Sequence, residues 1–141
     1  MAAVKNWVPD RCCTCSVRDD SSVRFRGFGL KLWVASNLAP PYAVPLRSQL
    51  AGLVDGFCLS FEVGAVKPEV AYFGELCSQA GCTPVLAVMV GDSVRSDVEG
   101  AKASGMRAVH LGRDSAAARP GGVRSLAELA DMIERGNRSW P

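Results

Sequence analysis

The segment from Val85 to Val90 constrains the fold more than any other stretch of the sequence. It holds six consecutive apolar residues and stops at Gly91-Asp92. An apolar run without alternation is typical of a strand that is buried on both faces, as in a parallel sheet. This run therefore predicts a central strand that ends in a carboxylate.

The residues that follow this strand predict a helix and then a second strand. Ser96-Asp97-Val98-Glu99 matches a capping box, and Gly105 suits the left-handed position that ends a helix. Residues 107–111 are apolar enough to form the next strand. The sequence thus predicts a β-α-β unit, with acidic residues at the edge where open α/β sheets bind their ligands.

The rest of the chain from Leu30 onwards shows the same alternation of strand and helix. Further strands are predicted at 30–35 and 57–61. Further helices are predicted at 42–51, from Pro68 to the stop at Gly81, and from the capping box Ser125-Leu126-Ala127-Glu128 to Gly136. Such an alternation predicts an α/β fold with a doubly wound, mostly parallel sheet.

Composition excludes several classes of protein. With 141 residues and 48% hydrophobic content, the chain can bury one ordinary core. A formal charge of +2 does not favour nucleic acid or an anionic membrane as a partner. No apolar run reaches the roughly 20 residues that a membrane helix needs, and no signal peptide is recognisable. Three of the six cysteines fall in predicted core elements, which favours a reducing cytoplasm.

Polar residues follow two of the predicted strands, at positions that suit a phosphate site. Ser36-Asn37 follow the strand at 30–35, and Asp92 follows the strand at 85–90. Lys67 lies in a loop that can project toward the same edge, and Asp97 stands five residues after Asp92. Carboxylates are hard ligands for Mg²⁺, while an ammonium and a hydroxyl can bind phosphate oxygens. The sequence therefore predicts a site for a small phosphorylated molecule and a divalent metal.

These motifs together resemble motifs two, three and four of the haloacid dehalogenase (HAD) superfamily. Ser-Asn after a strand, Lys-Pro before a helix, and Gly-Asp-Ser-Val-Arg-Ser-Asp after another strand occur in the expected order between about Leu30 and Ile133. The resemblance implies a Rossmann-like HAD sheet and a Mg²⁺-dependent phosphatase that works through a phosphoaspartate. A 2-haloacid dehalogenase and a catalytically inactive binding or interaction module remain as alternatives.

The resemblance also implies a role for each residue of these motifs. Ser36 would donate a hydrogen bond to the transferring phosphoryl group, and Asn37 would hold the substrate or the loop. Lys67 would neutralise the charge of the nucleophile and the phosphate. Asp92 would bind Mg²⁺, and Asp97 would bind it too or orient the site from behind.

The first motif of the family, a strand that ends in Asp-x-Asp, is not recognisable in the sequence. Its nearest match begins at Asp10, but Pro9 precedes that aspartate and Cys12 stands where the family has its acid/base aspartate. The sequence therefore predicts a truncated or rearranged family member that lacks the first, central strand and the cap domain. The position of this strand would be filled by residues 4–8, closed by its neighbours, or taken by a strand from another chain through self-association.

Three further interpretations complete the expectations from sequence. Residues 1–26 are predicted to form a poorly ordered or divergent segment, 27–136 the HAD-like core domain, and 137–141 a tail. Cys12 and Cys15 have a C-x-x-C spacing, but no second pair follows to complete a structural zinc site, so the role of Cys12, Cys13 and Cys15 stays open. His110, the sole histidine, is predicted to be a packed strand residue.

Overall fold

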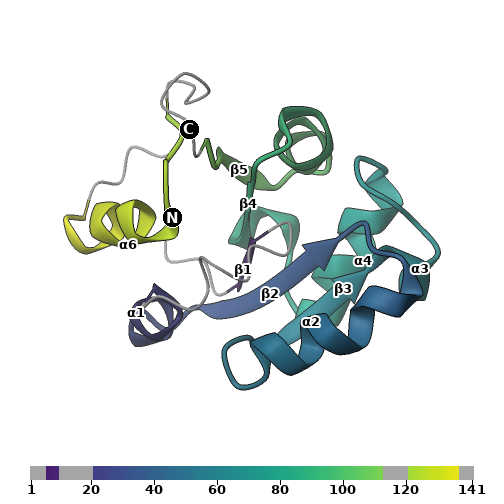
Figure 1. Cartoon of the computed structure of the whole chain (residues 1–141). Coiled ribbons are helices and arrows are strands. Elements are labelled where there is room, and N and C mark those ends of the chain that lie inside the picture. The colour runs from purple at the N-terminus through teal and green to yellow at the C-terminus, as the bar shows by residue number, and fades with distance from the viewer. Residues whose placement is uncertain (1–5, 10–20, 113–120, 137–141) are drawn as a thin grey trace.

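A parallel sheet with helices on both faces forms the centre of the molecule (Figure 1). The structure, a computed structural model, describes residues 6–9, 21–112 and 121–136. The strand order is β3-β2-β1-β4-β5, and every neighbouring pair runs parallel. The strands are β1 (Asn6–Pro9), β2 (Lys31–Ser36), β3 (Gly56–Leu59), β4 (Ala87–Gly91) and β5 (Arg107–His110). The predicted α/β fold with a parallel sheet is confirmed.

The helices connect these strands in the predicted alternation. They are α1 (Ser21–Gly27), α2 (Ala43–Leu50), α3 (Ser60–Val63), α4 (Val70–Ala80), α5 (Gly100–Ala103) and α6 (Leu126–Glu134). Two short 3₁₀ helices, Pro40–Tyr42 and Pro84–Leu86, precede α2 and β4, and a π-helix, Val94–Glu99, leads into α5. Ser125 accepts a hydrogen bond from the backbone N–H of Glu128, so the predicted start of α6 is confirmed.

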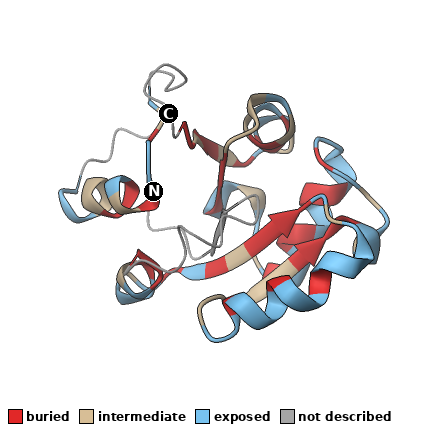
Figure 2. Ribbon diagram, viewed as in Figure 1, coloured by how far each residue is buried: buried red, intermediate tan, exposed pale blue. Residues whose placement is uncertain are grey.

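The sheet separates two apolar cores, one on each face. One core joins α1, α2 and α6 to the sheet, and the other joins α4 and α5 to its opposite face. Successive residues of β4 alternate between the two, with Val88 in the first core and Met89 in the second. Both faces of this strand are therefore buried, as predicted for residues 87–90. Val85 and Leu86, which the sequence places in the same strand, lie instead in the 3₁₀ helix before it and are exposed. Figure 2 shows the same pattern, since burial is concentrated in the strands and on the inner sides of the helices.

The central strand is present, and the expectation that it is missing is wrong. Asn6 to Pro9 form β1, which pairs with β2 on one side and with β4 on the other. The strand is only four residues long and ends in proline, so its local sequence gives a weak strand signal. Pairing with β2 and β4 stabilises the extended backbone of β1, for which the local sequence has little preference. Of the three ways to fill this position, the structure shows the first, a segment of the same chain. This segment is residues 6–9, whereas residues 4–8 were predicted.

Residues 21–26, which the sequence groups with the N-terminal segment, belong to the layered fold. They lie in α1, where the side chain of Phe25 is completely buried in the first core. Arg24 on this helix forms ion pairs with Asp131 and Glu134 of α6, at 2.6 and 2.8 Å. A seven-residue helix has too few turns for a sustained apolar period, and this explains why the sequence does not reveal it. Residues 10–20 lie outside the described part of the chain.

The helical segment after β4 begins earlier than its predicted capping box. The side chain of Ser93, and not that of Ser96, accepts the capping hydrogen bond, which comes from the backbone N–H of Ser96. The predicted capping box at Ser96 to Glu99 is therefore wrong. The helical turns start at Val94, two residues after Asp92, and this places Asp97 in the first turn, against the end of β4.

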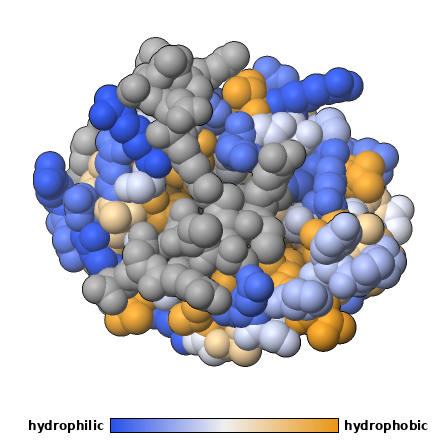
Figure 3. All heavy atoms as spheres, viewed as in Figure 1, coloured by the Kyte–Doolittle hydropathy of each residue, from blue (hydrophilic) through white to orange (hydrophobic). Residues whose placement is uncertain are grey.

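The described surface is mixed in polarity. On the face shown in Figure 3, hydrophobic residues stand as separate patches among hydrophilic ones. Tyr42, Val44 and Val70 are among the large apolar side chains that are mostly exposed. None of the helices in the described residues is both long and apolar enough to span a membrane.

Candidate functional site

The ends of β2 and β4 bring Ser36 and Asp92 to the same edge of the sheet. Both strands run parallel to β1, which lies between them. Ser36 is the last residue of β2 and is 4% exposed. Asp92 directly follows the last residue of β4. Because parallel strands end at a common edge, the predicted placement of these two residues on one edge is confirmed.

The side chain of Lys67 lies across this edge. Its Nζ donates hydrogen bonds to the backbone O of Ala35, at 3.2 Å, and to Asp97 Oδ1, at 3.0 Å. Ala35 belongs to β2, and Asp97 packs against the end of β4, which is separated from β2 in the sheet by β1. A side chain that joins these two groups stands beside the carboxyl end of β1. The ammonium is thus placed between the strand ends that carry the other site residues.

Asn37 holds the backbone of Lys67. Its side-chain Nδ2 donates to the backbone O of Lys67, at 3.0 Å, and its Oδ1 accepts from the backbone N–H of Lys67, at 2.9 Å. This double contact fixes the loop in front of α4 to the end of β2. Both oxygen and nitrogen of the amide are used, so Asn37 positions the loop, one of the two roles expected from the sequence.

Asp97 is completely buried, and both of its carboxylate oxygens have partners. Oδ1 accepts from Lys67 Nζ, and Oδ2 accepts from the backbone N–H of Ser93, at 2.9 Å. The carboxylate packs directly on the backbone of Gly91, where a Cβ would lie 2.6 Å from the Cβ of Asp97. The glycine before Asp92 is therefore required for this close approach. The glycine of the Gly91-Asp92 pair is thus explained by the packing of Asp97 against it.

Burial and charge act in opposite directions on Lys67. Desolvation lowers the pKa of its ammonium below the ordinary value of 10.5, while the negative charges of Asp97 and Asp92 raise it. Burial is the larger effect, so the net pKa is lowered. The Lys67–Asp97 pair has 1% and 0% side-chain exposure, which leaves little water to screen its charge.

The carboxylates at this edge suit magnesium better than a softer metal. Asp92 Oδ1 is buried at the end of β4. Among residues 6–9, 21–112 and 121–136, no three histidine, cysteine or acidic side chains form a group that could hold a metal. Mg²⁺ characteristically takes one or two carboxylates and completes its shell with water and substrate phosphate. The oxygen donor of Asp92 fits such a site.

His110 makes a contact that the sequence does not predict. It lies in β5, where it pairs with Gly91, as a strand residue should. Its Nε2 is 3.2 Å from the backbone O of Asp92. The imidazole thus lies against the backbone of the candidate site. Asp10 and the three cysteines at 12, 13 and 15 lie outside the described residues.

Comparison with known proteins agrees with the motifs and their geometry. The HAD-hydrolase-like family matches residues 65–129. The glyceraldehyde 3-phosphate phosphatase of Methanothermobacter thermautotrophicus is 34% identical over 83 residues, which cover 57% of this chain and 37% of that enzyme. The phosphoserine phosphatase of Thermus thermophilus is 42% identical over 90 residues, which cover 60% of this chain and 35% of that enzyme.

A solved structure extends this similarity to the fold. The HAD phosphatase from Thermococcus onnurineus superposes with a TM-score of 0.71 at 31% identity, over 82% of this chain and 55% of that protein. This chain belongs to the haloacid dehalogenase superfamily. The HAD chain spans about a third of the length of the two curated phosphatases that it matches, and about half of the solved one.

Proposed function

We propose that this HAD chain is a Mg²⁺-dependent phosphatase that hydrolyses a small phosphorylated metabolite through an aspartyl-phosphate on Asp10. One observation carries the proposal. Ser36, Lys67 and Asp92 gather at one edge of the sheet, around the end of β1. The residue that follows β1 in the chain is Asp10. A carboxylate there would be the nucleophile for a phosphoryl group held by the other three.

The proposed reaction has two displacements at phosphorus. The carboxylate of Asp10 attacks phosphorus, the bond from phosphorus to the ester oxygen breaks, and the leaving oxygen takes a proton from solvent water to give the alcohol. Water then attacks the aspartyl-phosphate, which releases inorganic phosphate and restores the carboxylate. Two such steps replace one difficult displacement.

The described residues would stabilise the charge that develops on the phosphoryl oxygens. Ser36 would donate a hydrogen bond from its hydroxyl or backbone, and the ammonium of Lys67 would balance negative charge in a buried setting. Asp92 and Asp10 would hold Mg²⁺, which when bound supplies positive charge to the phosphate oxygens. Asp97 would act through Lys67, since its oxygens hold that ammonium and the backbone of Ser93.

A second candidate is a phosphate-binding HAD module without turnover. The observation in its favour is Cys12, which stands two residues after Asp10 in place of an acid/base carboxylate. A thiol is a weaker general acid for a leaving alcohol at neutral pH than a tuned carboxyl group. The edge formed by Ser36, Lys67 and Asp92 would still bind phosphate in such a protein.

Hydrolysis of p-nitrophenyl phosphate separates the two candidates. The phosphatase proposal predicts Mg²⁺-dependent turnover that Asp10→Asn and Asp92→Asn each lower by at least a hundredfold. Glu75→Gln, on the exposed side of α4, is the matched control and should keep full activity. A folded wild-type protein that binds phosphate but gives no turnover would favour the binding module. Turnover that survives Asp10→Asn would contradict the proposed nucleophile.

A further inference from the structure

The end of α4 brings two cysteines together through its backbone. Gly81 has a left-handed conformation, with φ 66°, and its N–H donates to the backbone O of Ser78 at 3.2 Å. The N–H of Cys82 donates to the backbone O of Cys77 at 3.0 Å. These two bonds define a Schellman motif, in which the residue after the glycine contacts the side chain five positions earlier. In this chain both partners of that contact are cysteines.

The distance between the two cysteines suits a disulfide. The bonded oxygen lies two covalent bonds from the Cα of Cys77, and the bonded nitrogen lies one bond from the Cα of Cys82. A 3.0 Å hydrogen bond between them therefore keeps the Cα atoms less than about 7 Å apart, the separation beyond which a disulfide would need backbone movement. Both thiols are free in the structure.

The two thiols differ in access to solvent. Cys77 is 4% exposed, whereas Cys82 is only half-buried and packs at the margin of the second core. Burial raises the pKa of the Cys77 thiol to about 12, and the neighbouring Cys82 thiol adds to this shift. A reagent from solution therefore reaches Cys82 first. Cys77 then reacts with the group that the reagent has left on the Cys82 sulfur.

We propose that Cys77 and Cys82 form a dithiol that low-molecular-weight disulfides oxidise to an intrachain disulfide. The Cys82 sulfur attacks the external disulfide and forms a mixed disulfide, while one external thiol leaves with the proton of Cys82. The Cys77 sulfur then attacks the Cys82 sulfur of that mixed disulfide, and the second external thiol leaves with the proton of Cys77. One disulfide is consumed, one is formed, and two external thiols are released.

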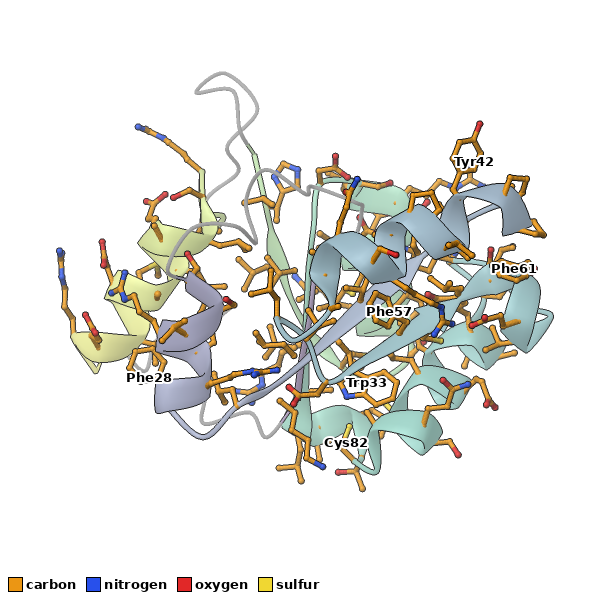
Figure 4. The ribbon with its side chains drawn as sticks, turned by 60° about the horizontal axis from the view of Figure 1, so that its bottom comes forward. Phe28, Trp33, Tyr42, Phe57, Phe61 and Cys82 are labelled. Carbon is orange, nitrogen blue, oxygen red and sulfur yellow. The ribbon has the colours of Figure 1, made fainter. Side chains whose placement is uncertain are left out.

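The dithiol lies at the opposite end of the sheet from the candidate phosphate site. α4 begins three residues after Lys67, at the carboxyl edge, and ends before β4 starts at the amino edge. Figure 4 shows Cys82 near Trp33 and far from Tyr42, which follows the carboxyl end of β2. Oxidation should therefore stabilise the end of α4 and the loop behind it without contact with the site.

The test measures how strongly the folded protein favours the disulfide. A variant with Cys12, Cys13 and Cys15 changed to serine is equilibrated with mixtures of reduced and oxidised glutathione, in native buffer and in concentrated urea. After alkylation and cleavage beside glutamate, the peptide that runs from Leu76 to Glu99 contains Cys77 and Cys82 and no other cysteine. A peptide that has lost two hydrogen atoms and carries no alkyl group reports the disulfide. The unsubstituted chain gives the same peptide, so the readout does not depend on the triple variant folding.

The proposal predicts an equilibrium constant for disulfide formation at least about tenfold larger in native buffer than in urea, because the fold holds the two thiols together. By the same linkage the oxidised protein should melt at a higher temperature than the reduced one. Cys82→Ser should remove both effects. An equal or smaller constant in native buffer would overturn the proposal, as would native protein that stops at a glutathione adduct on Cys82.

Discussion

Lys67 Nζ and Asp97 Oδ1 form a 3.0 Å ion pair that is almost completely shielded from water. The pair joins the loop before α4 to the helical turns behind β4. Lys67 is thereby held beside the end of β1, where a phosphoryl group would need a positive charge. A buried pair of this kind gives little net stability by itself, but the loss of one partner leaves a buried charge without its counter-ion.

Removal of the carboxylate should therefore destabilise the fold strongly. Asp97→Ala is expected to lower the free energy of unfolding by about 3–5 kcal/mol, because the ammonium of Lys67 would remain buried and uncompensated. Urea denaturation measures the change. The matched control is Glu62→Gln in the exposed ion pair with Arg47, where the expected loss is below about 1 kcal/mol. Equal losses in the two variants would show that removal of one partner costs no more stability in the buried pair than in the exposed one.

Gly91 should not tolerate a side chain. A Cβ at this position would lie 2.5 Å from the Cγ of Asp97, so Gly91→Ala is expected to cost about 1–3 kcal/mol through overpacking. Gly74→Ala offers a direct contrast in the same denaturation assay. Its Cβ would meet nothing within 4 Å, and alanine in a helix is favoured over glycine by roughly 0.5–1 kcal/mol. The first variant should lose stability and the second should gain it; the reverse order would be inconsistent with the close packing of Asp97 on Gly91.

Cys58 should make the stability of the protein sensitive to alkaline pH. Burial raises the pKa of its thiol from 9.0 to about 11, so between these values the folded state keeps a proton that the unfolded state has lost. Stability falls with rising pH wherever the folded state binds more protons. The advantage of wild type over Cys58→Ala is thus largest below pH 9.0 and shrinks toward about pH 11. Urea denaturation of both proteins at several pH values measures this advantage, and a constant difference would mean that the thiol titrates normally in the fold.

The sequence predicts the strands that carry the site well, because each has a strong local signal. Residues 87–90 of the apolar run are buried on both faces of β4 as expected, whereas Val85 and Leu86 precede the strand in a 3₁₀ helix and are exposed. Ser36 ends β2, and Asp92 directly follows the parallel strand β4. β1 could not be predicted in the same way. Four residues that end in Pro9 carry little local preference, and their place depends on pairing with β2 and β4, which are remote in sequence.

The roles of Asn37 and Asp97 also depend on contacts that sequence spacing does not reveal. Asn37 and Asp97 each form a hydrogen bond with Lys67, and each is 30 residues away from it in the sequence. The motifs indicate that these residues belong to one site, but they do not say which of them touch one another. Ser93 and Ser96 differ for a simpler reason, since both can cap a helix and only the exact path of the chain after β4 decides between them.

The most direct test of the site is calorimetric titration of inorganic phosphate with and without Mg²⁺. If Ser36, Lys67 and Asp92 hold an anion together with its metal, Mg²⁺ should strengthen phosphate binding by wild type at least about tenfold, a coupling of about 1.4 kcal/mol. Asp92→Asn should abolish that gain, whereas Asp131→Asn on α6, where the carboxylate pairs with Arg24 of α1, should retain it. Phosphate binding that Mg²⁺ strengthens equally in wild type and Asp92→Asn, or no phosphate binding by the folded protein, would contradict the account.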